Sequence, residues 1–304
     1  MTPRIAVAVA SHARPLRLRW LLNALAEQTA SDFEVVVAHD GGPDSETARL
    51  VAEHPVVTRS IAFDGDHGPS ELRNAAWRAT SAPFVAFTDD DCRPPASWVE
   101  RAAAAARPDA IVQGRTRPDP DELGLLRAPH PRTVWIDPPT ASAQTCNAIY
   151  PRDLLEKVGG FDEHAFPTCA AEDTDLAWRS GAPIVAAPEV VTFHCVEPIS
   201  LARAVRIAWR WRQLPKLVAR HPGLRRHMPL RVFWRRRHAL LLLAAITRHP
   251  LAILAYAIDA LPVYGTSPRG LVRAATELPG LVVVDAVEVA ALAAGSAKHR
   301  TLFL

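Results

Sequence analysis

Strand-like and helix-like segments alternate along the chain between residues 4 and 200. Five short apolar runs are rich in strand formers: 4–10, 32–40, 56–63, 83–89 and 110–114. Segments with helical periodicity separate them: 14–28, 43–54, 68–80 and 95–108. In the first of these, leucines at 18, 21, 22 and 25 fall on one helical face. Alternation of this kind predicts an α/β fold with a mostly parallel, doubly wound sheet flanked by helices.

The charge of the chain is distributed unevenly. Its 304 residues suffice for one large domain or for a domain with a substantial appendage. Between Pro198 and Ile258 there are 13 Lys and Arg residues and no Asp or Glu. The remaining 22 basic and 32 acidic residues give the rest of the chain a net charge of −10. We therefore expect an acidic domain over residues 1–198 and a basic helical region over 199–304.

The C-terminal region combines basic and apolar segments. Residues 200–218 are predicted to form an amphipathic helix, and apolar runs follow at 238–246 and 250–258. Neither run reaches the roughly 20 residues of a membrane-spanning helix. Two interpretations stay open: helices that lie on a membrane surface, or an ordinary α-helical subdomain with a solvated basic face.

Neither a secretory signal nor a disulfide framework is expected. The N-terminal residues run directly into a short apolar strand, without a long apolar region and cleavage site. Four cysteines, at 92, 146, 169 and 195, are far apart and form no C-x-x-C pair. This pattern favours reduced thiols in the cytoplasm over a zinc site or disulfides.

Three aspartates, Asp89, Asp90 and Asp91, follow the apolar run that ends at Thr88. Like charges in sequence are tolerated when a cation lies among them or when water solvates them all. In an extended segment Asp89 and Asp91 point to one side, and Asp90 points to the other. A D-x-D pair together with a diphosphate suits Mg²⁺ or Mn²⁺. A solvated acidic loop is the alternative.

Six segments occur in an order typical of one enzyme family: VASHARPLRLRWLLNALAEQ, VVVAHDGGPD, GPSELRNAAW, FTDDDCRPPASW, VGGFDE and EDTDLAWR. Over roughly residues 4–200 the chain resembles the family 2 glycosyltransferases, which use nucleotide-sugar donors. The resemblance implies a GT-A fold, which is Rossmann-like, over residues 1–198. A C-terminal α-helical extension, basic and apolar, would then follow over residues 199–304, possibly associated with a membrane.

The resemblance also implies a donor site. Asp40 would receive the imide N–H of the base, although a turn-forming Asp before Gly is the simpler interpretation. Arg73 would lie near the base and the phosphates, where its fork suits a diphosphate. Asp89 would approach the ribose and Asp90 would lie beside it. Gly160, in VGGFDE, would line the donor-sugar cleft, or else belong to a helix C-cap.

The same resemblance implies metal and catalytic residues. Asp91 and His194 would bind Mn²⁺ or Mg²⁺. Asp173 would be the general base and Glu172 would support acceptor binding. Both acids open a predicted helix, where the macrodipole favours negative charge and is expected to keep Asp173 ionised. That electrostatic effect alone also explains acids at these positions.

These assignments predict an inverting, metal-dependent transfer from a nucleotide-diphosphate sugar to a hydroxyl of a glycan or lipid-linked acceptor. The enzyme is expected to be cytoplasmic, bound peripherally to the anionic inner face of the cell membrane, without a nucleic-acid partner. A haloacid-dehalogenase-type phosphotransferase would need its aspartates on the first strand. A nucleotidyltransferase would need a Gly-rich, Lys-containing loop there. The remaining alternative is a membrane-surface or nucleic-acid binder with a degenerate transferase fold. The base, sugar, acceptor and oligomeric state are not predicted.

Overall fold

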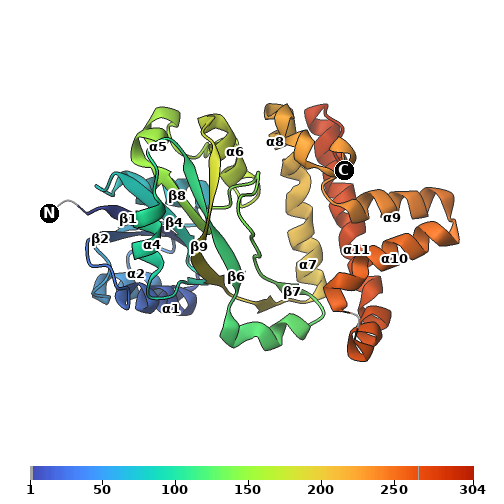
Figure 1. The fold of residues 1–304 in the computed structure, drawn as a ribbon, viewed down its shortest axis with the longest axis horizontal. Helices are drawn as coiled ribbons and strands as arrows, with labels where there is room; N and C mark the ends of the chain where they lie inside the picture. The colour runs from blue at the N-terminus through green and yellow to red at the C-terminus, as the bar shows by residue number, and fades with distance from the viewer. Residues whose placement is uncertain (1–2, 266) are drawn as a thin grey trace. The chain divides into compact units, whose positions relative to one another are not determined.

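The computed structural model describes residues 3–265 and 267–304 and divides into two compact units. Unit 1 comprises Met1–Gly124 and Thr133–Glu197, and unit 2 comprises Leu125–Arg132 and Pro198–Leu304. Figure 1 shows the elements of both units.

Unit 1 is built on an eight-stranded sheet with the order β3-β2-β1-β4-β8-β6-β9-β5. Neighbours from β3 to β4 are all parallel, as are β6 and β9, whereas β8 is antiparallel to both β4 and β6 and β5 is antiparallel to β9. The predicted α/β fold with a mostly parallel sheet is thereby confirmed. The strands are β1 (Ile5–Ser11), β2 (Phe33–His39), β3 (Arg59–Ala62), β4 (Phe84–Asp89), β5 (Cys92–Arg93), β6 (Ile111–Pro118), β8 (Asn147–Pro151) and β9 (Ile184–His194).

Helices cover both faces of this sheet, which explains why its strands are apolar on both sides. In β1, Val7 and Val9 pack toward α1, α2 and α4, whereas Ala8 packs toward α3, α5 and α6. The four leucines expected on one face of α1 are all fully buried. The helices are α1 (Pro15–Ala26), α2 (Glu46–Glu53), α3 (Pro69–Arg78), α4 (Trp98–Ala105), α5 (Arg152–Val158) and α6 (Glu172–Ser180).

The strand directions bring functional segments to one edge of the sheet. Strands β1, β2, β4 and β9 run in the same direction, so the residues that follow them meet at their carboxyl ends, where open α/β sheets bind ligands. Beyond β6, residues 117–139 are rich in proline, a composition that predicts a long loop, but the structure shows regular elements there. This stretch contains the 3₁₀ helix η1 (Pro120–Arg127) and the short strand β7 (Pro131–Arg132).

Unit 2 is helical. The predicted amphipathic helix is interrupted, because a 3₁₀ segment, η2 (Trp209–Gln213), separates its two α-helical parts. Arg248 ends α9 with a positive φ, and the His249 side chain caps α10. The elements are β10 (Glu197–Pro198), α7 (Leu201–Ala208), α8 (Leu214–Arg220), η3 (Pro222–His227), η4 (Pro229–Arg231), α9 (Arg236–Thr247), α10 (Pro250–Tyr264) and α11 (Pro268–His299).

The long helix α11 was not foreseen in the sequence. Among the described residues it is the one helix that is long and apolar enough to cross a membrane, by length and composition alone. The same test is passed by core helices of soluble units. Two acids in α11, Asp285 and Glu288, are buried and form ion pairs with arginines near the start of α9. Buried ion pairs thus connect α11 to the start of α9 within unit 2.

Candidate active site

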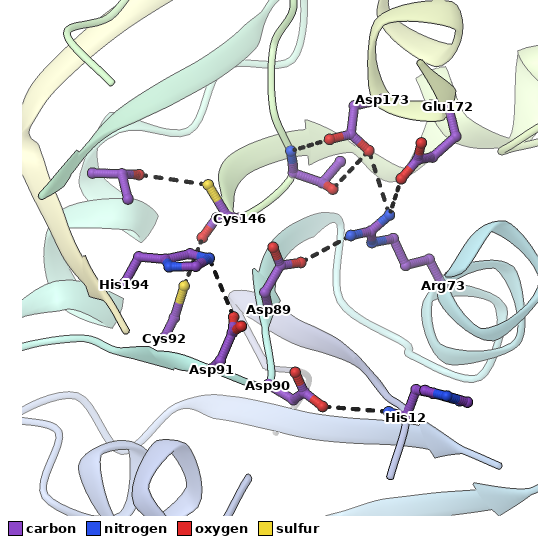
Figure 2. A network of polar contacts seen from close by, with 12 residues as sticks. His12, Arg73, Asp89, Asp90, Asp91, Cys92, Cys146, Glu172, Asp173 and His194 are labelled. Atoms are coloured by element: carbon purple, nitrogen blue, oxygen red, sulfur yellow. Dashed lines mark hydrogen bonds and ion pairs between the residues drawn. The ribbon is translucent and has the colours of Figure 1, made fainter. Parts of the chain in front are cut away.

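The three adjacent aspartates face three different neighbours (Figure 2). Asp89 is the last residue of β4, and its Oδ1 accepts a hydrogen bond of 2.8 Å from Arg73 Nη2. Asp90 faces the end of β1, and Asp91 faces the end of β9. The like charges are tolerated because each carboxylate has its own donors from another element of the fold.

Arg73 connects the aspartates to the start of α6. Its Nη1 lies 3.0 Å from Glu172 Oε1 and 3.4 Å from Asp173 Oδ1, while Nη2 binds Asp89. Burial alone would lower the pKa of Arg73, but Asp173, Asp89 and Glu172 raise it well above its usual value. The guanidinium therefore stays charged and joins carboxylates that lie 16, 99 and 100 residues from it in the chain.

Asp173 is partly buried and held on both oxygens. The Thr145 hydroxyl donates to Oδ1 at 3.0 Å, and the Thr145 N–H donates to Oδ2 at 3.1 Å. Burial, followed by the charge of Glu172, raises the pKa of Asp173 to about 7 against the opposing effect of Arg73. The sequence suggested that the helix N-terminus would keep this group fully ionised. Burial and the neighbouring acid instead make it titrate near neutrality, which suits proton acceptance.

Glu172 is buried, and both of its oxygens contact groups of the protein. Oε1 accepts from Arg73, and Oε2 accepts from the Ala170 N–H at 2.7 Å. The turn into α6 includes Ala171 with φ +85°, a left-handed conformation that costs a non-glycine residue energy. These contacts position Arg73 and the turn, and the expected role of Glu172 in acceptor binding stays a prediction.

Asp90 is buried where β1 and β4 end. Its Oδ2 accepts from the Ser11 hydroxyl at 2.9 Å and from the His12 N–H at 3.3 Å. Arg14 Nη1 lies 3.2 Å from its Oδ1 and also contacts Asp91. Burial raises the pKa of Asp90 to about 7 despite Arg14, and the nearby Asp91 adds to the rise. Asp90 thus ties the aspartate triplet to the segment that follows β1.

Asp91 and His194 form a pair suited to a divalent cation. His194 Nε2 lies 3.3 Å from Asp91 Oδ1, and its Nδ1 lies 2.9 Å from the carbonyl oxygen of Cys195. A carbonyl only accepts, so Nδ1 carries a proton, and Nε2 is the ring nitrogen that faces the carboxylate. Two acceptors in this arrangement favour a cation between them, with the carbonyl fixing the tautomer. Carboxylate oxygen and imidazole nitrogen both suit Mn²⁺.

Asp40 lies directly after β2 and is buried. Its Oδ2 contacts His12 Nδ1 and accepts from the His67 N–H at 3.4 Å. Two glycines with positive φ, +92° at Gly41 and +80° at Gly42, follow it in a turn. The carboxylate therefore sits at the same sheet edge as the aspartate triplet, next to the residues that follow β1.

Gly160 lies against Asn74 and Trp77 of α3. Gly159 ends α5 in the left-handed region, so this segment does form the helix C-cap that its sequence allowed. A Cβ at Gly160 would approach Asn74 Oδ1 to 2.2 Å, which is prohibitive. Close packing is enough to require glycine here, and the expected contact with the donor sugar stays a prediction.

Several site residues were missed in the sequence. Ser11, His12 and Arg14 bind the aspartates, and a signal existed because they follow the first strand at the edge where ligands bind. Thr145, which holds Asp173, precedes β8 in a stretch without a motif. Cys195, whose thiol donates to Asp91 at 3.5 Å, had no signal beyond its place after His194.

Comparisons with known proteins identify the family of the chain. The sequence model described as "Glycosyl transferase family 2" matches residues 6–159. Glycosyltransferase AglE of Haloferax volcanii is 24% identical over 207 residues, which is 64% of this chain and 68% of that protein. Succinoglycan biosynthesis protein ExoM of Rhizobium meliloti is 27% identical over 227 residues, 68% of this chain and 71% of that protein.

Two solved structures share the fold. The mannosyltransferase PcManGT of Pyrobaculum calidifontis, in complex with GDP-Man and Mn²⁺, has a TM-score of 0.55 and 21% identity, covering 99% of this chain and 88% of that one. Residues 1–349 of S. aureus TarS, in complex with UDP-GlcNAc, have a TM-score of 0.52 and 15% identity, covering 99% and 93%.

The sheet order and the two similar structures show that unit 1 has a fold of the GT-A type. The sequence match over residues 6–159 shows that the chain belongs to glycosyl transferase family 2. The family, the fold class and the assignment as an enzyme are therefore confirmed as the sequence predicted them.

Proposed function

We propose that this enzyme is metal-dependent and inverting, and that it moves a sugar from a nucleotide-diphosphate donor to a hydroxyl of a glycan or lipid-linked acceptor. The observation that carries the proposal is the Arg73 guanidinium, which joins Asp89 on one side to Asp173 on the other. Donor and acceptor groups would then be held on either side of one buried, charged side chain.

On the donor side, Asp91 and His194 would hold Mn²⁺ or Mg²⁺. Such a cation would neutralise the charge that grows on the departing nucleotide diphosphate. Asp40 would accept the imide N–H of the base, and Asp89 would accept a ribose hydroxyl. Asp90, bound by Ser11 and His12, would fix the backbone of the triplet beside the donor.

On the acceptor side, Asp173 would be the general base. The acceptor O–H bond breaks as its proton moves to Asp173, and the oxygen forms a bond to the anomeric carbon. The bond from that carbon to the β-phosphate oxygen breaks, and its electron pair leaves with the diphosphate. Within the described residues, Asp173 Oδ2 accepts one hydrogen bond, from Thr145 N–H, so it retains capacity for the acceptor hydroxyl.

We further propose that unit 2 holds the enzyme at the cytoplasmic face of a membrane. Its segment from Pro198 to Ile258 has 13 basic residues and no acid. Such a segment is attracted to the negative surface potential of anionic lipids. This location would bring unit 1 close to a lipid-linked or envelope glycan acceptor.

The test is nucleotide binding, measured by calorimetry with UDP, GDP, dTDP and CDP, with and without Mn²⁺. The protein should bind one nucleotide in a Mn²⁺-dependent manner. Asp91→Asn should lose that dependence, whereas Asp109→Asn, at an exposed site, should retain it. GDP-Man and UDP-GlcNAc, bound in the two similar structures, are the first donors for a transfer assay. Absence of any nucleotide binding by the wild type would favour a degenerate transferase fold.

A further inference from the structure

The helical hairpin of α9 and α10 exposes large apolar side chains. Seven of them, between 47% and 80% exposed, form what we call the hairpin surface: Leu243, Ile246, Leu251, Ile253, Leu254, Ile258 and Val263. Figure 1 shows the two helices side by side, with their connecting turn directed away from α11. Contiguous exposed apolar side chains mark a surface that contacts something other than water.

The orientation of α10 is the reverse of that in a water-soluble amphipathic helix. Its buried stripe consists of Ala252, Tyr256, Ala260 and Tyr264, which are spaced four residues apart. Its large aliphatic residues Leu251, Leu254 and Ile258 lie on the exposed side. A soluble helix turns its apolar stripe to the core and its polar residues outward. Here the hydroxyl of Tyr256 donates a hydrogen bond of 2.9 Å to Asp285. The polar contact therefore lies on the buried face of α10, and the aliphatic side chains lie on the exposed face.

Charge identifies what covers this surface. The connecting turn exposes Arg248 and His249, and no acid occurs between Pro198 and Ile258. The one acid of the hairpin, Asp259, lies 3.2 Å from the Arg236 guanidinium and is thereby neutralised. An apolar surface with an exposed arginine at its turn and no unpaired carboxylate complements the headgroups and acyl chains of an anionic bilayer.

We propose that the hairpin surface inserts into the interfacial region of an anionic membrane. The aliphatic side chains would enter the boundary between headgroups and acyl chains, and Arg248 would remain at the phosphates. This inference rests on the membrane association proposed above and adds to it that the binding is apolar as well as electrostatic. In this location the exposed aliphatic face of α10 would contact acyl chains in place of water, which is favourable.

The test is sedimentation of the full chain with vesicles of phosphatidylcholine that contain phosphatidylglycerol. The triple variant Ile246→Ser, Leu251→Ser, Leu254→Ser should partition at least about tenfold more weakly than wild type, since it loses buried aliphatic surface. The matched control is Leu230→Ser with Leu302→Ser, two equally exposed leucines of unit 2 outside the hairpin. It should partition within about twofold of wild type. Circular dichroism shows whether each variant is folded, which is expected because all these positions are exposed.

The salt dependence of vesicle binding distinguishes apolar insertion of the hairpin from purely electrostatic association of unit 2. Wild type should keep part of its binding in about 1 M NaCl, where charge attraction is screened within a few ångström. Binding that vanishes in high salt and ignores the hairpin serines would overturn the insertion and leave the electrostatic association standing. Absence of wild-type binding to any vesicle would overturn both. A different outcome is that sedimentation velocity shows the wild type to be a dimer and the triple variant to be a monomer. The hairpin surface would then contact a second copy of the chain, and the proposal would be overturned as well.

Discussion

Each unit of this glycosyltransferase contains a buried network of arginines and acids, and the two networks differ in how completely their charges are matched. In unit 1, the single Arg73 guanidinium faces Asp89, Glu172 and Asp173. In unit 2, Arg237 binds Asp285 through two nitrogens at 2.9 and 3.2 Å, and Tyr256 donates to the same carboxylate.

The pKa values follow this difference. Burial would raise the pKa of Glu288 in unit 2, but His238 and Arg235 outweigh it and lower the pKa. In unit 1 the balance is reversed, and burial raises the pKa values of Asp90 and Asp173 to about 7. A network in which each buried acid has its own cation stabilises the packing of helices. A network with more acids than cations leaves carboxylates that can bind a ligand, a metal or a proton. The predictions below test that contrast.

The largest expected effect is on catalysis. Asp173→Asn removes the proposed base and should lower kcat by about 10²- to 10⁴-fold. Its unfolding midpoint should not fall, because a buried and undermatched charge is removed. The control is Asp175→Asn on the same helix, which breaks an ion pair of 2.7 Å to Arg179. That variant should lose stability and keep turnover per folded molecule. Full activity of Asp173→Asn would reject the assignment.

The matched network should respond in the opposite way. Asp285→Ala leaves Arg237 buried without its partner and should lower the free energy of unfolding of unit 2 by about 3 kcal/mol. Urea unfolding followed by the fluorescence of the tryptophans at 209, 211 and 234 measures this loss. Nucleotide binding in unit 1 should persist under native conditions. An unchanged midpoint would mean that the network does not stabilise the unit.

The pH dependence of stability should also separate the units. Asp90 and Asp173 have folded pKa values raised to about 7, above those of an unfolded chain, so their ionisation destabilises the folded state. Metal-free protein should therefore gain stability as the pH falls from about 8 toward 5. Glu288, whose folded pKa is lowered, contributes stability that is lost only at more acidic pH. Thermal melts of wild type and the double variant Asp90→Asn, Asp173→Asn should differ in slope over that window, with the variant flatter.

Arg14 provides a smaller and more specific test of the undermatched site. Its guanidinium contacts both Asp90 and Asp91 and therefore repels any other cation from them. Arg14→Ala should tighten Mn²⁺ binding in the absence of nucleotide by about tenfold, as expected for one charge removed a few ångström away in a partly solvated site. Electron paramagnetic resonance of free Mn²⁺ measures the affinity. Arg17→Ala, whose guanidinium binds Glu122, is the control and should leave it unchanged. Weaker binding in Arg14→Ala would show that Arg14 supports the metal site.

The sequence predicted the framework of unit 1 better than the contacts of its site. The apolar runs and the leucine stripe of α1 depend on local sequence alone. The strands and the helix could therefore be predicted without knowing which elements they pack against. The link from Arg73 to Asp173 spans 100 residues, and no sequence pattern predicted it, because the family resemblance gave each residue only a role of its own. The raised pKa of Asp173 comes from burial and from Glu172, neither of which a local rule about helix N-termini captures. Likewise, α11 was missed because its two buried acids, Asp285 and Glu288, interrupt an apolar pattern, and their partners on α9 are about 50 residues away.

The smallest effect is expected at the turn that leads into α6. Ala171 has φ +85°, where a side chain is strained and glycine is not. Ala171→Gly should therefore change the stability by no more than about 1 kcal/mol, since relief of strain opposes the greater freedom of glycine in the unfolded chain. Activity is the sharper readout, because Glu172 accepts from the preceding Ala170 N–H and positions Arg73. If strain in this turn fixes the network, Ala171→Gly should lower kcat several-fold while the melting temperature stays nearly constant, as measured by turnover and thermal melts. A kcat of Ala171→Gly equal to that of the wild type would mean that Glu172 and Thr145 position Arg73 and Asp173 without any contribution from the turn.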